Sequence, residues 1–498
     1  MKITRRYFCG SVAGATAGAA MPRSLLFGQE QPAEGGSNGR PRPTPEQLAW
    51  QDMELGLFIH FEIVTFTGQA FPRTPIDPNR YNPVKLDTDQ WLEAAKAIGA
   101  KYAVFVAKHS TSFLQWQSNA WPYGVKQSSW RNGKGDVVKD FIASCKKYDI
   151  RPGIYAQVMS DAFWNVNQGR VNGGKGGDPK RQAEYAKACE AMLTELWSNY
   201  GELTEIWFDG GVLPVEQGGP DVVPLLKRYQ PKAMVFQGPA ATIRWIGNEE
   251  GVASYPCWAT APEGRDVNGP GDPNGPRWLP GECDVPLPGH TWIWVSEQDP
   301  NTDPAIRAVA KAARDSLGAS KPLDKLMQMY YKSVGRNCNL LLNAGPDPTG
   351  LIPEADLKHY ADFGKEIRRR FSKPVAETAG KGAVVELALK KPGRIDQVMI
   401  MEDIRHGERV RAYEIEGLVL GNSWQRLCDG VSIGHKRIQQ FAPLEVAKVR
   451  LRVTESVAVP QIRRLAVFDV DSDSRQSDAR QLTSPAKKAS FHHLRIGI

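Results

Sequence analysis

Short apolar runs alternate with amphipathic stretches from about residue 55 to residue 375 of this chain. Each run is four to six residues long, which suits a buried strand and is too short for a helix. In the stretches between them, apolar residues recur at helical spacing. Strands that alternate with helices pair in parallel through crossover connections, so the pattern predicts an α/β fold. The predicted strands are 55–60, 102–107, 152–155, 205–209, 234–237, 292–295 and 339–343.

Two of the predicted helices start at an aspartate. Asp87 and Asp136 each precede an amphipathic stretch, and an Asp side chain there accepts a hydrogen bond from an unpaired N–H group of the first turn. Two longer helices are predicted at 181–200 and at 354–371.

A chain of 498 residues is too long for one ordinary core. The strand–helix part therefore favours a (β/α)8-like barrel over residues 46–373, followed by a second domain. From about 256 to 290 the alternation is lost in Pro- and Gly-rich sequence, where we expect a long loop on the functional face of the barrel.

The period changes after Pro374. Alternating apolar residues predict strands joined by turns with no helix between them, which indicates a β-sandwich over residues 374–470. Residues 471–498 are polar, and we expect them to be disordered. The predicted strands of the sandwich are 384–389, 397–400, 409–415 and 449–453.

Charge is concentrated at the N-terminus. The formal net charge is +8, and the first 29 residues hold four basic residues and no acid, so removing them would leave +4. No stripe of basic and aromatic residues is present, which argues against a nucleic-acid partner. With 14 Trp and 47 Gly, the balance fits a neutral sugar ligand at least as well as an anionic one.

The first 29 residues are similar to a twin-arginine export signal. Arg5-Arg6 is followed by an aromatic pair and then by a short run rich in Ala and Gly from Gly10 to Met21. This run is too short and too poor in Leu and Ile to span a bilayer as an anchor. We expect residues 1–29 to direct export to the bacterial periplasm or the medium, and residues 30–45 to be a linker.

The cysteines do not indicate a metal or a disulfide framework. Seven are present, without CxxC spacing and without a His partner at zinc-ligand spacing, so no structural metal and no cofactor is expected. Export in the folded state from a reducing cytoplasm predicts buried free thiols. Cys257 and Cys283 are the one pair that merits inspection. The sequence leaves the oligomeric state open.

The strand at 205–209 ends in a carboxylate followed by two glycines, Asp209-Gly210-Gly211. In a barrel, the C-terminal ends of strands carry the catalytic side chains, although an Asp at a strand end can also simply cap a turn. Glycosidic cleavage needs two carboxylates flanking one bond. The second candidate is Glu249, 40 residues further on, with Glu250 as its rival. Arg244 and Trp245 stand beside this acidic pair.

Five motifs, in order along the chain, resemble the α-L-fucosidase family of retaining glycoside hydrolases (glycoside hydrolase family 29), and most closely its α-1,3/4-fucosidase-like subgroup. The motifs are Phe58-Ile59-His60-Phe61, Ala107-Lys108-His109, Trp207-Phe208-Asp209-Gly210, Gly247-Asn248-Glu249 and the segment from Gly335 to Asn343. The likeness covers roughly residues 46–470.

The resemblance implies a glycan substrate and a double-displacement mechanism without a cofactor. It implies that Asp209 is the nucleophile and Glu249 the general acid/base. His60 and His109 match positions that hydrogen-bond fucose hydroxyls. Arg244 and Trp245 are expected to line the sugar pocket, the Trp as a face for the C–H side of the ring. Tyr155 and Trp292 are interpreted as core residues.

Several positions depart from the family pattern. The second motif usually continues as His-His-Asp-Gly-Phe, whereas here it reads His109-Ser110-Thr111-Ser112-Phe113. Glu62 stands where Gly is usual, Ala70-Phe71 where a Glu-Trp pair is usual, and Met159-Ser160 where Trp-Asp is usual. Because these positions shape the sugar pocket, the alternative function is a catalytically impaired carbohydrate-binding homologue.

Overall fold

A computed structural model describes most of the chain between residues 39 and 470. The predicted export signal, most of the predicted linker, residues 70–71 and the C-terminal tail lie outside the described residues. The described ranges are 39–68, 74–174, 177–264, 267–287, 292–295, 321–419 and 423–470, with single residues at 304, 307, 308, 311 and 421.

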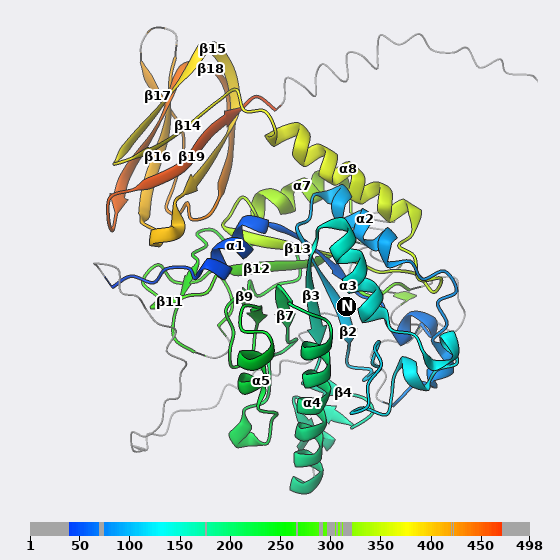
Figure 1. Cartoon of the computed structure of the whole chain (residues 1–498). Helices are drawn as coiled ribbons and strands as arrows, with labels where there is room; N and C mark the ends of the chain where they lie inside the picture. The colour runs from blue at the N-terminus through cyan, green and yellow to red at the C-terminus, as the bar shows by residue number, and fades with distance from the viewer. Residues whose placement is uncertain are drawn as a thin grey trace, which may run out of the picture.

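Eight parallel strands form the barrel (Figure 1). They follow one another in chain order from β8 back to β1 and then through β13 and β12 to β9. A single bridge between Phe236 and Ile243 joins the two end strands, so the sheet is nearly closed. The strands are β1 (Leu55–Ile59), β2 (Tyr102–Lys108), β3 (Arg151–Ala156), β7 (Glu205–Trp207), β8 (Met234–Phe236), β9 (Arg244–Trp245), β12 (Gly281–Pro286) and β13 (Cys338–Ala344).

Helices pack around the outside of the barrel, and the predicted caps are confirmed. The Asp87 carboxylate accepts from the N–H of Asp89, and the Asp136 carboxylate accepts from the N–H of Lys139. The helices are α1 (Pro45–Met53), α2 (Thr88–Ile98), α3 (Val137–Tyr148), α4 (Pro179–Asn199), α5 (Val222–Tyr229), α7 (Leu323–Lys332) and α8 (Glu354–Phe371).

Two barrel strands differ from the sequence prediction. β12 lies inside the segment predicted to be a loop, and residues 292–295 form no strand but a bend followed by irregular backbone. In β12 the acids Glu282 and Asp284 are buried and alternate with Cys283 and Val285. Because two of its six residues are acids and it ends in Pro, this strand contains no continuous apolar run. β9 has two residues, too few to show any period.

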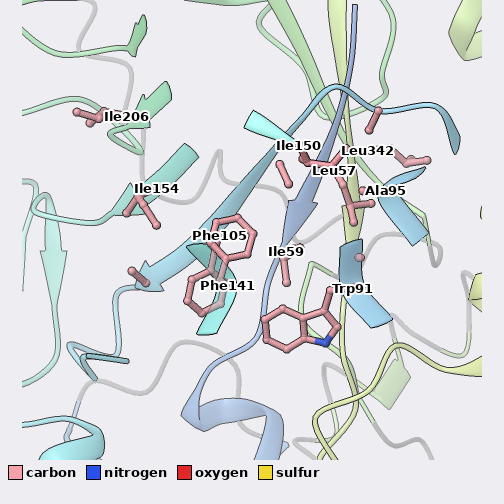
Figure 2. Packing of buried hydrophobic residues seen from close by; sticks show 14 of the residues in the cluster. Leu57, Ile59, Trp91, Ala95, Phe105, Phe141, Ile150, Ile154, Ile206 and Leu342 are labelled. Carbon is pink, nitrogen blue, oxygen red and sulfur yellow. The ribbon is translucent and has the colours of Figure 1, made fainter. Parts of the chain in front are cut away.

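The core has an outer layer and an inner one. Outside the strands, Leu57, Ile59 and Leu342 pack against Trp91 and against other helix residues (Figure 2). Inside the barrel the cluster is rich in aromatic rings, and the Trp207 and Phe236 rings stack with centroids 3.6 Å apart. Rings of this size fill the lumen, so the barrel is a packed core and not a pore.

Two carboxyl groups lie among these rings. Glu205 accepts a hydrogen bond from the Trp50 indole N–H at 2.7 Å. Glu282 accepts one from the Tyr102 hydroxyl at 2.6 Å and one from the Trp207 indole at 2.9 Å. Burial raises the pKa of both carboxyl groups.

The C-terminal domain is one six-stranded antiparallel sheet in the order β14-β19-β15-β18-β16-β17. Register shifts interrupt its two longest strands, and the sheet folds over an apolar core of its own, as a β-sandwich does (Figure 1). All four predicted strands are present, and the first two merge into β15. The strands are β14 (Ala376–Lys381), β15 (Val384–Glu402), β16 (Val410–Leu418), β17 (Trp424–Gly430), β18 (Arg437–Ser456) and β19 (Gln461–Phe468).

Shorter elements complete the fold. A three-stranded sheet follows β3, and a two-stranded ribbon precedes β12. Their strands are β4 (Ser160–Asp161), β5 (Val166–Asn167), β6 (Arg170–Val171), β10 (Thr260–Ala261) and β11 (Arg277–Trp278). The short 3-10 helices are η2 (Ile63–Phe66), η3 (Pro78–Arg80), η4 (Val125–Gln127), η5 (Trp130–Gly133), η6 (Asn172–Gly174), η7 (Val215–Gln217) and η8 (Ile404–His406).

The β-sandwich holds the chain segment that follows β9. The buried Glu408 carboxylate accepts from the backbone N–H of Ala259 at 2.9 Å, and the Arg411 guanidinium lies 4.7 Å from the Trp258 ring. The Tyr255 hydroxyl accepts from the N–H of Val431 at 2.9 Å. The sandwich therefore contacts the barrel through the loop between β9 and β12.

A second contact joins the sandwich to the start of β1. The Glu54 carboxylate pairs with the Lys436 ammonium and, at 2.9 Å, with the His435 ring. These partners lower the pKa of Glu54 to about 2 against the opposing effect of burial.

Candidate active site

The predicted histidines and carboxylates follow the C-terminal ends of barrel strands. His60 directly follows β1 and His109 directly follows β2. Asp209 lies two residues beyond β7, and Glu249 lies four residues beyond β9. Since parallel strands of a barrel present their C-terminal ends on one face, these residues share that face.

His60 is held by an asparagine on β13. Its Nδ1 lies 2.6 Å from Asn343 Oδ1, and Asn343 Nδ2 donates to the carbonyl oxygen of Trp292 at 2.7 Å. Because the amide nitrogen donates to a carbonyl, the amide oxygen is the acceptor, and His60 Nδ1 must donate to it. The Asn therefore fixes the tautomer of His60 with Nε2 as an acceptor.

Tyr155 on β3 connects His109 to Asp209. The rings of His109 and Tyr155 stack with an interplanar angle of 3° and centroids 5.5 Å apart. The Tyr155 hydroxyl donates to Asp209 Oδ2 at 3.0 Å. One side chain thus orients the carboxylate and supports the imidazole.

The turn after β7 depends on its two glycines. Gly210 and Gly211 have φ of +73° and +82°, a region that is strained for a side chain with Cβ. The Gly210 N–H donates to the Gln237 side chain at 2.9 Å. Asp209 is half-buried, so its carboxylate is held yet can be reached by a ligand.

Trp292 binds the second carboxylate. Its indole N–H donates to Glu249 Oε2 at 3.1 Å, and its ring centroid lies 5.1 Å from that of His60. Glu249 is half-buried, whereas Glu250 is exposed. The sequence did not decide between Glu249 and Glu250 as the second carboxylate. In the structure it is Glu249 that is connected to the His60 ring through Trp292.

One cluster of rings lies between the two carboxylates. The His60 ring centroid is 6.0 Å from that of His109 and 6.1 Å from that of Tyr155. Contacts consequently run from Asp209 through the cluster to Glu249. Such an arrangement can hold two carboxylates around one sugar ring, as cleavage of a glycosidic bond requires.

The comparisons with known proteins agree in one family. A model of the α-L-fucosidase family matches residues 76–237. A crystal structure of a candidate α-L-fucosidase from Bacteroides thetaiotaomicron is 39% identical, with a TM-score of 0.78, and the match covers 86% of this chain and 100% of that one. This chain belongs to the α-L-fucosidase family.

Two further members extend this likeness. The α-L-fucosidase 1 of Arabidopsis thaliana is 29% identical over 477 residues, which is 86% of this chain and 87% of that protein. A glycoside hydrolase 29 family member from an unknown rumen bacterium is 30% identical with a TM-score of 0.73, and the match covers 86% of this chain and 77% of that one. The family likeness therefore includes both the barrel and the sandwich.

Arg244 and Trp245 differ from the other predicted site residues of this family member. The Arg244 side chain is buried and donates to the backbone carbonyls of Gly269, Leu279 and Trp258. Arg244 therefore braces the loop between β9 and β12. It was expected to line the sugar pocket, but its hydrogen-bond partners in the structure are these backbone carbonyls. Trp245 packs against the barrel interior and donates to Asp284 at 2.7 Å.

Three residues that hydrogen-bond the candidate site residues were not assigned this role from the sequence. Tyr155 and Trp292 were interpreted as core, and the structure does place Tyr155 in the inner core cluster with Trp292 packed against it, but each also donates to a candidate catalytic carboxylate. Asn343 offered a usable signal, since it is a polar residue that follows Leu340-Leu341-Leu342 near a strand end. A buried amide there needs hydrogen-bond partners, and the active site provides them.

Behind the rings, a buried ion pair supports the loop after β2. Lys108 Nζ lies 2.8 Å from Asp161 Oδ2, and both side chains are fully buried. Ser112 donates to the same carboxylate at 2.8 Å. The ion pair joins the end of β2 to the three-stranded sheet after β3, and the Ser112 hydrogen bond joins the loop after β2 to the same sheet.

Neither a metal cluster nor a membrane-spanning helix is found in the part of the chain that the structure describes. The six cysteines there are free thiols; five are buried, as expected, and Cys428 is half-buried. Cys257 and Cys283, the one pair considered for a disulfide, are both free thiols, and Cys257 Sγ lies 3.3 Å from Cys338 Sγ on β13.

Proposed function

We propose that this member of the family is a retaining exo-α-L-fucosidase that releases a terminal α-L-fucosyl residue by double displacement. Family membership supports the reaction. The observation that carries the assignment of residues is the ring cluster, since Tyr155 donates to Asp209 and Trp292 donates to Glu249. A protein that only bound sugar would have no need for both carboxylates.

In the first step, a carboxylate oxygen of Asp209 attacks the anomeric carbon and the bond to the leaving oxygen breaks. Glu249 gives its proton to that oxygen. In the second step, Glu249 takes a proton from water, and the water oxygen displaces Asp209 from the anomeric carbon. Both carboxyl groups return to their initial states.

His60 and His109 are proposed to bind the sugar. The neutral His60 tautomer set by Asn343 gives Nε2 the role of an acceptor, which suits a sugar hydroxyl. We include Trp245 as a wall of the pocket because it is half-buried beside the ring cluster. Arg244 acts in the proposal only by bracing the loop after β9.

Replacement of the nucleophile tests this function. Asp209→Ala should abolish hydrolysis of an aryl α-L-fucoside, and azide should restore turnover because it can take the place of the missing carboxylate. Glu250→Gln is the matched control for Glu249→Gln, and it should keep its activity. Unchanged hydrolysis by Asp209→Ala would falsify the assignment, and sugar binding without any turnover in the wild type would favour the impaired homologue.

The linkage is proposed from the motif resemblance alone. We expect α-1,3- and α-1,4-linked fucose to be cleaved in preference to α-1,2-linked fucose. A panel of fucosylated oligosaccharides, with an aryl α-L-galactoside beside the fucoside, measures both linkage and sugar. Preference for the galactoside would show that the altered pocket positions have changed the sugar.

Export through the twin-arginine route is proposed for the precursor. Replacing both Arg5 and Arg6 by Lys should retain the protein in the cytoplasm of a bacterial host, whereas the wild type should be recovered from the periplasm or medium. Equal distribution of the two would contradict the proposal.

A further inference from the structure

Glu62 belongs to the loop that follows β1, and its side chain contacts His109 and the loop that follows β2. The side chain is 2% exposed. Its Oε2 accepts a hydrogen bond from the Thr111 hydroxyl, and its Oε1 lies 3.5 Å from His109 Nδ1. Glu62 and Thr111 are two of the positions at which the sequence departs from the family motifs, and the structure brings these departures together.

Within the described part of the chain, Glu62 Oε1 is buried and accepts no hydrogen bond of ordinary geometry. A buried carboxyl oxygen without such a bond destabilises the fold. A small movement of the His109 ring toward Oε1 would supply the bond. A hydrogen bond between His109 Nδ1 and Glu62 Oε1 would therefore stabilise the local structure.

The charged and titratable groups around Glu62 are few. The Lys108 ammonium is the neighbouring cation, and it is paired with Asp161 at 2.8 Å. The Tyr123 hydroxyl also senses the charge of Glu62. Burial raises the pKa of Glu62 to about 8, while the Thr111 hydrogen bond and Lys108 act in the opposite direction.

The two nitrogens of His109 have linked roles. A neutral imidazole has one N–H donor and one acceptor, so the role of Nδ1 toward Glu62 fixes the opposite role for Nε2. The Ser110 hydroxyl, 3.0 Å from Nδ1, can donate or accept and is compatible with either tautomer.

We propose that Glu62 is a positioning residue that fixes which nitrogen of His109 carries the proton, and with it the hydrogen bond that His109 offers to the sugar. This inference rests on the proposed function, because it assumes that His109 binds the substrate.

The protonation of Glu62 then selects the tautomer. Protonated Glu62 donates to His109 Nδ1, and the Nε2–H group is a donor. When Glu62 loses its proton to the solvent, the His109 proton is carried on Nδ1 and donated to the carboxylate, so Nε2 becomes an acceptor. The exchange is between the two neutral tautomers of His109, and the pair loses one proton in total.

NMR of protein labelled with 15N-histidine tests the tautomer without any substrate. The His109 signals, identified by their loss in His109→Phe, should change from the Nε2–H to the Nδ1–H pattern with a midpoint near pH 8. Glu62→Gln should abolish this change, because Gln does not titrate. Thr111→Val should move the midpoint to higher pH, since it removes a hydrogen bond that stabilises the carboxylate.

Glu282→Gln is the matched control. It removes another buried carboxyl of the barrel whose pKa burial also raises, and it should leave the His109 midpoint unchanged. The proposal would be overturned if the His109 tautomer changed with the same midpoint in the wild type and in Glu62→Gln. It would also be overturned if Glu282→Gln, and not Glu62→Gln, abolished the change.

Calorimetric titration with L-fucose links the tautomer to the site. The affinity should change with the same midpoint in the wild type and be independent of pH over this range in Glu62→Gln, with a change of about twofold to tenfold, as for one hydrogen bond. An affinity change that persists in Glu62→Gln contradicts the inference alone. A wild type that neither binds L-fucose nor cleaves an aryl α-L-fucoside overturns the proposed function instead.

Discussion

Asn343 acts on the candidate site from behind the residues that would touch the sugar. Its amide fixes the His60 ring on one side and the Trp292 backbone on the other. Trp292 in turn binds Glu249, so this single amide influences both a proposed sugar-binding group and the proposed acid/base.

Asn343→Ala should lower kcat/KM for an aryl α-L-fucoside about tenfold to a hundredfold, since one buried and one partly buried hydrogen bond are lost. Asn339→Ala is the control. Asn339 lies on the same strand and is equally buried, but it donates to the Trp50 carbonyl at 2.9 Å, away from the rings of the site. Equal losses in the two variants would show a structural effect only.

Tyr155→Phe should keep the ring stack with His109 and remove only the hydroxyl on Asp209. We expect kcat to fall about tenfold or more, because a hydrogen bond to a charged group is lost. Thermal unfolding should change little. In Tyr185→Phe, which removes a buried hydroxyl from the Val158 carbonyl at 2.8 Å, kcat should be retained; a fall like that of Tyr155→Phe would count against the assigned role.

Single residues were predictable when they interrupted a pattern. Asp209, His60 and His109 each follow an apolar run, so they are recognisable as strand-end groups. Tyr155 and Trp292 are aromatic and belong to apolar runs themselves, so nothing in the pattern separates them from core residues. Only the fold shows that their polar atoms reach carboxylates.

At the scale of elements, the helices and strands that bury apolar side chains could be predicted from the sequence. The helices with Asp caps are present in the structure, and so are the strands with continuous apolar runs except at residues 292–295, which form no strand. β12 was missed because it contains two buried acids, Glu282 with partners on β2 and β7 and Asp284 with a partner on β9. Those partners are distant in sequence, so no local pattern contains them.

Glu282→Leu should destabilise the barrel by about 2 kcal/mol or more, because it leaves the Tyr102 hydroxyl and the Trp207 indole without their acceptor. Glu282→Gln should cost less, since its carbonyl oxygen can still accept. Urea unfolding measures the difference. Equal stability of the Leu variant and the wild type would show that these donors find other acceptors.

For the whole molecule, buried carboxyl groups set the dependence of stability on pH. Burial raises the pKa of Glu62 to about 8 and that of Glu402 to about 7 from 4.5. The folded state therefore binds more protons than the unfolded state between about pH 4.5 and pH 8. The free energy of unfolding should fall as the pH rises through this window.

Glu54 acts in the opposite direction, because its pKa is lowered to about 2. Its contribution is present above pH 4.5 and is lost as the pH falls toward 2. Urea unfolding from pH 3 to pH 9 should thus give greatest stability near pH 4.5. Glu402→Gln should flatten the alkaline side and Glu54→Gln the acidic side; a maximum that stays above pH 7 would contradict both assignments.

The clamp of the sandwich on residues 255–259 has a consequence for how such proteins are inherited and engineered. The segment that carries the proposed acid/base continues directly into the part of the chain that Glu408, Arg411 and the Val431 backbone hold. Barrel and sandwich therefore cannot be exchanged between relatives as independent modules. A chimaera that joins this barrel to a foreign sandwich would need the matching loop as well, so recombination should favour breakpoints that keep the loop and the sandwich together.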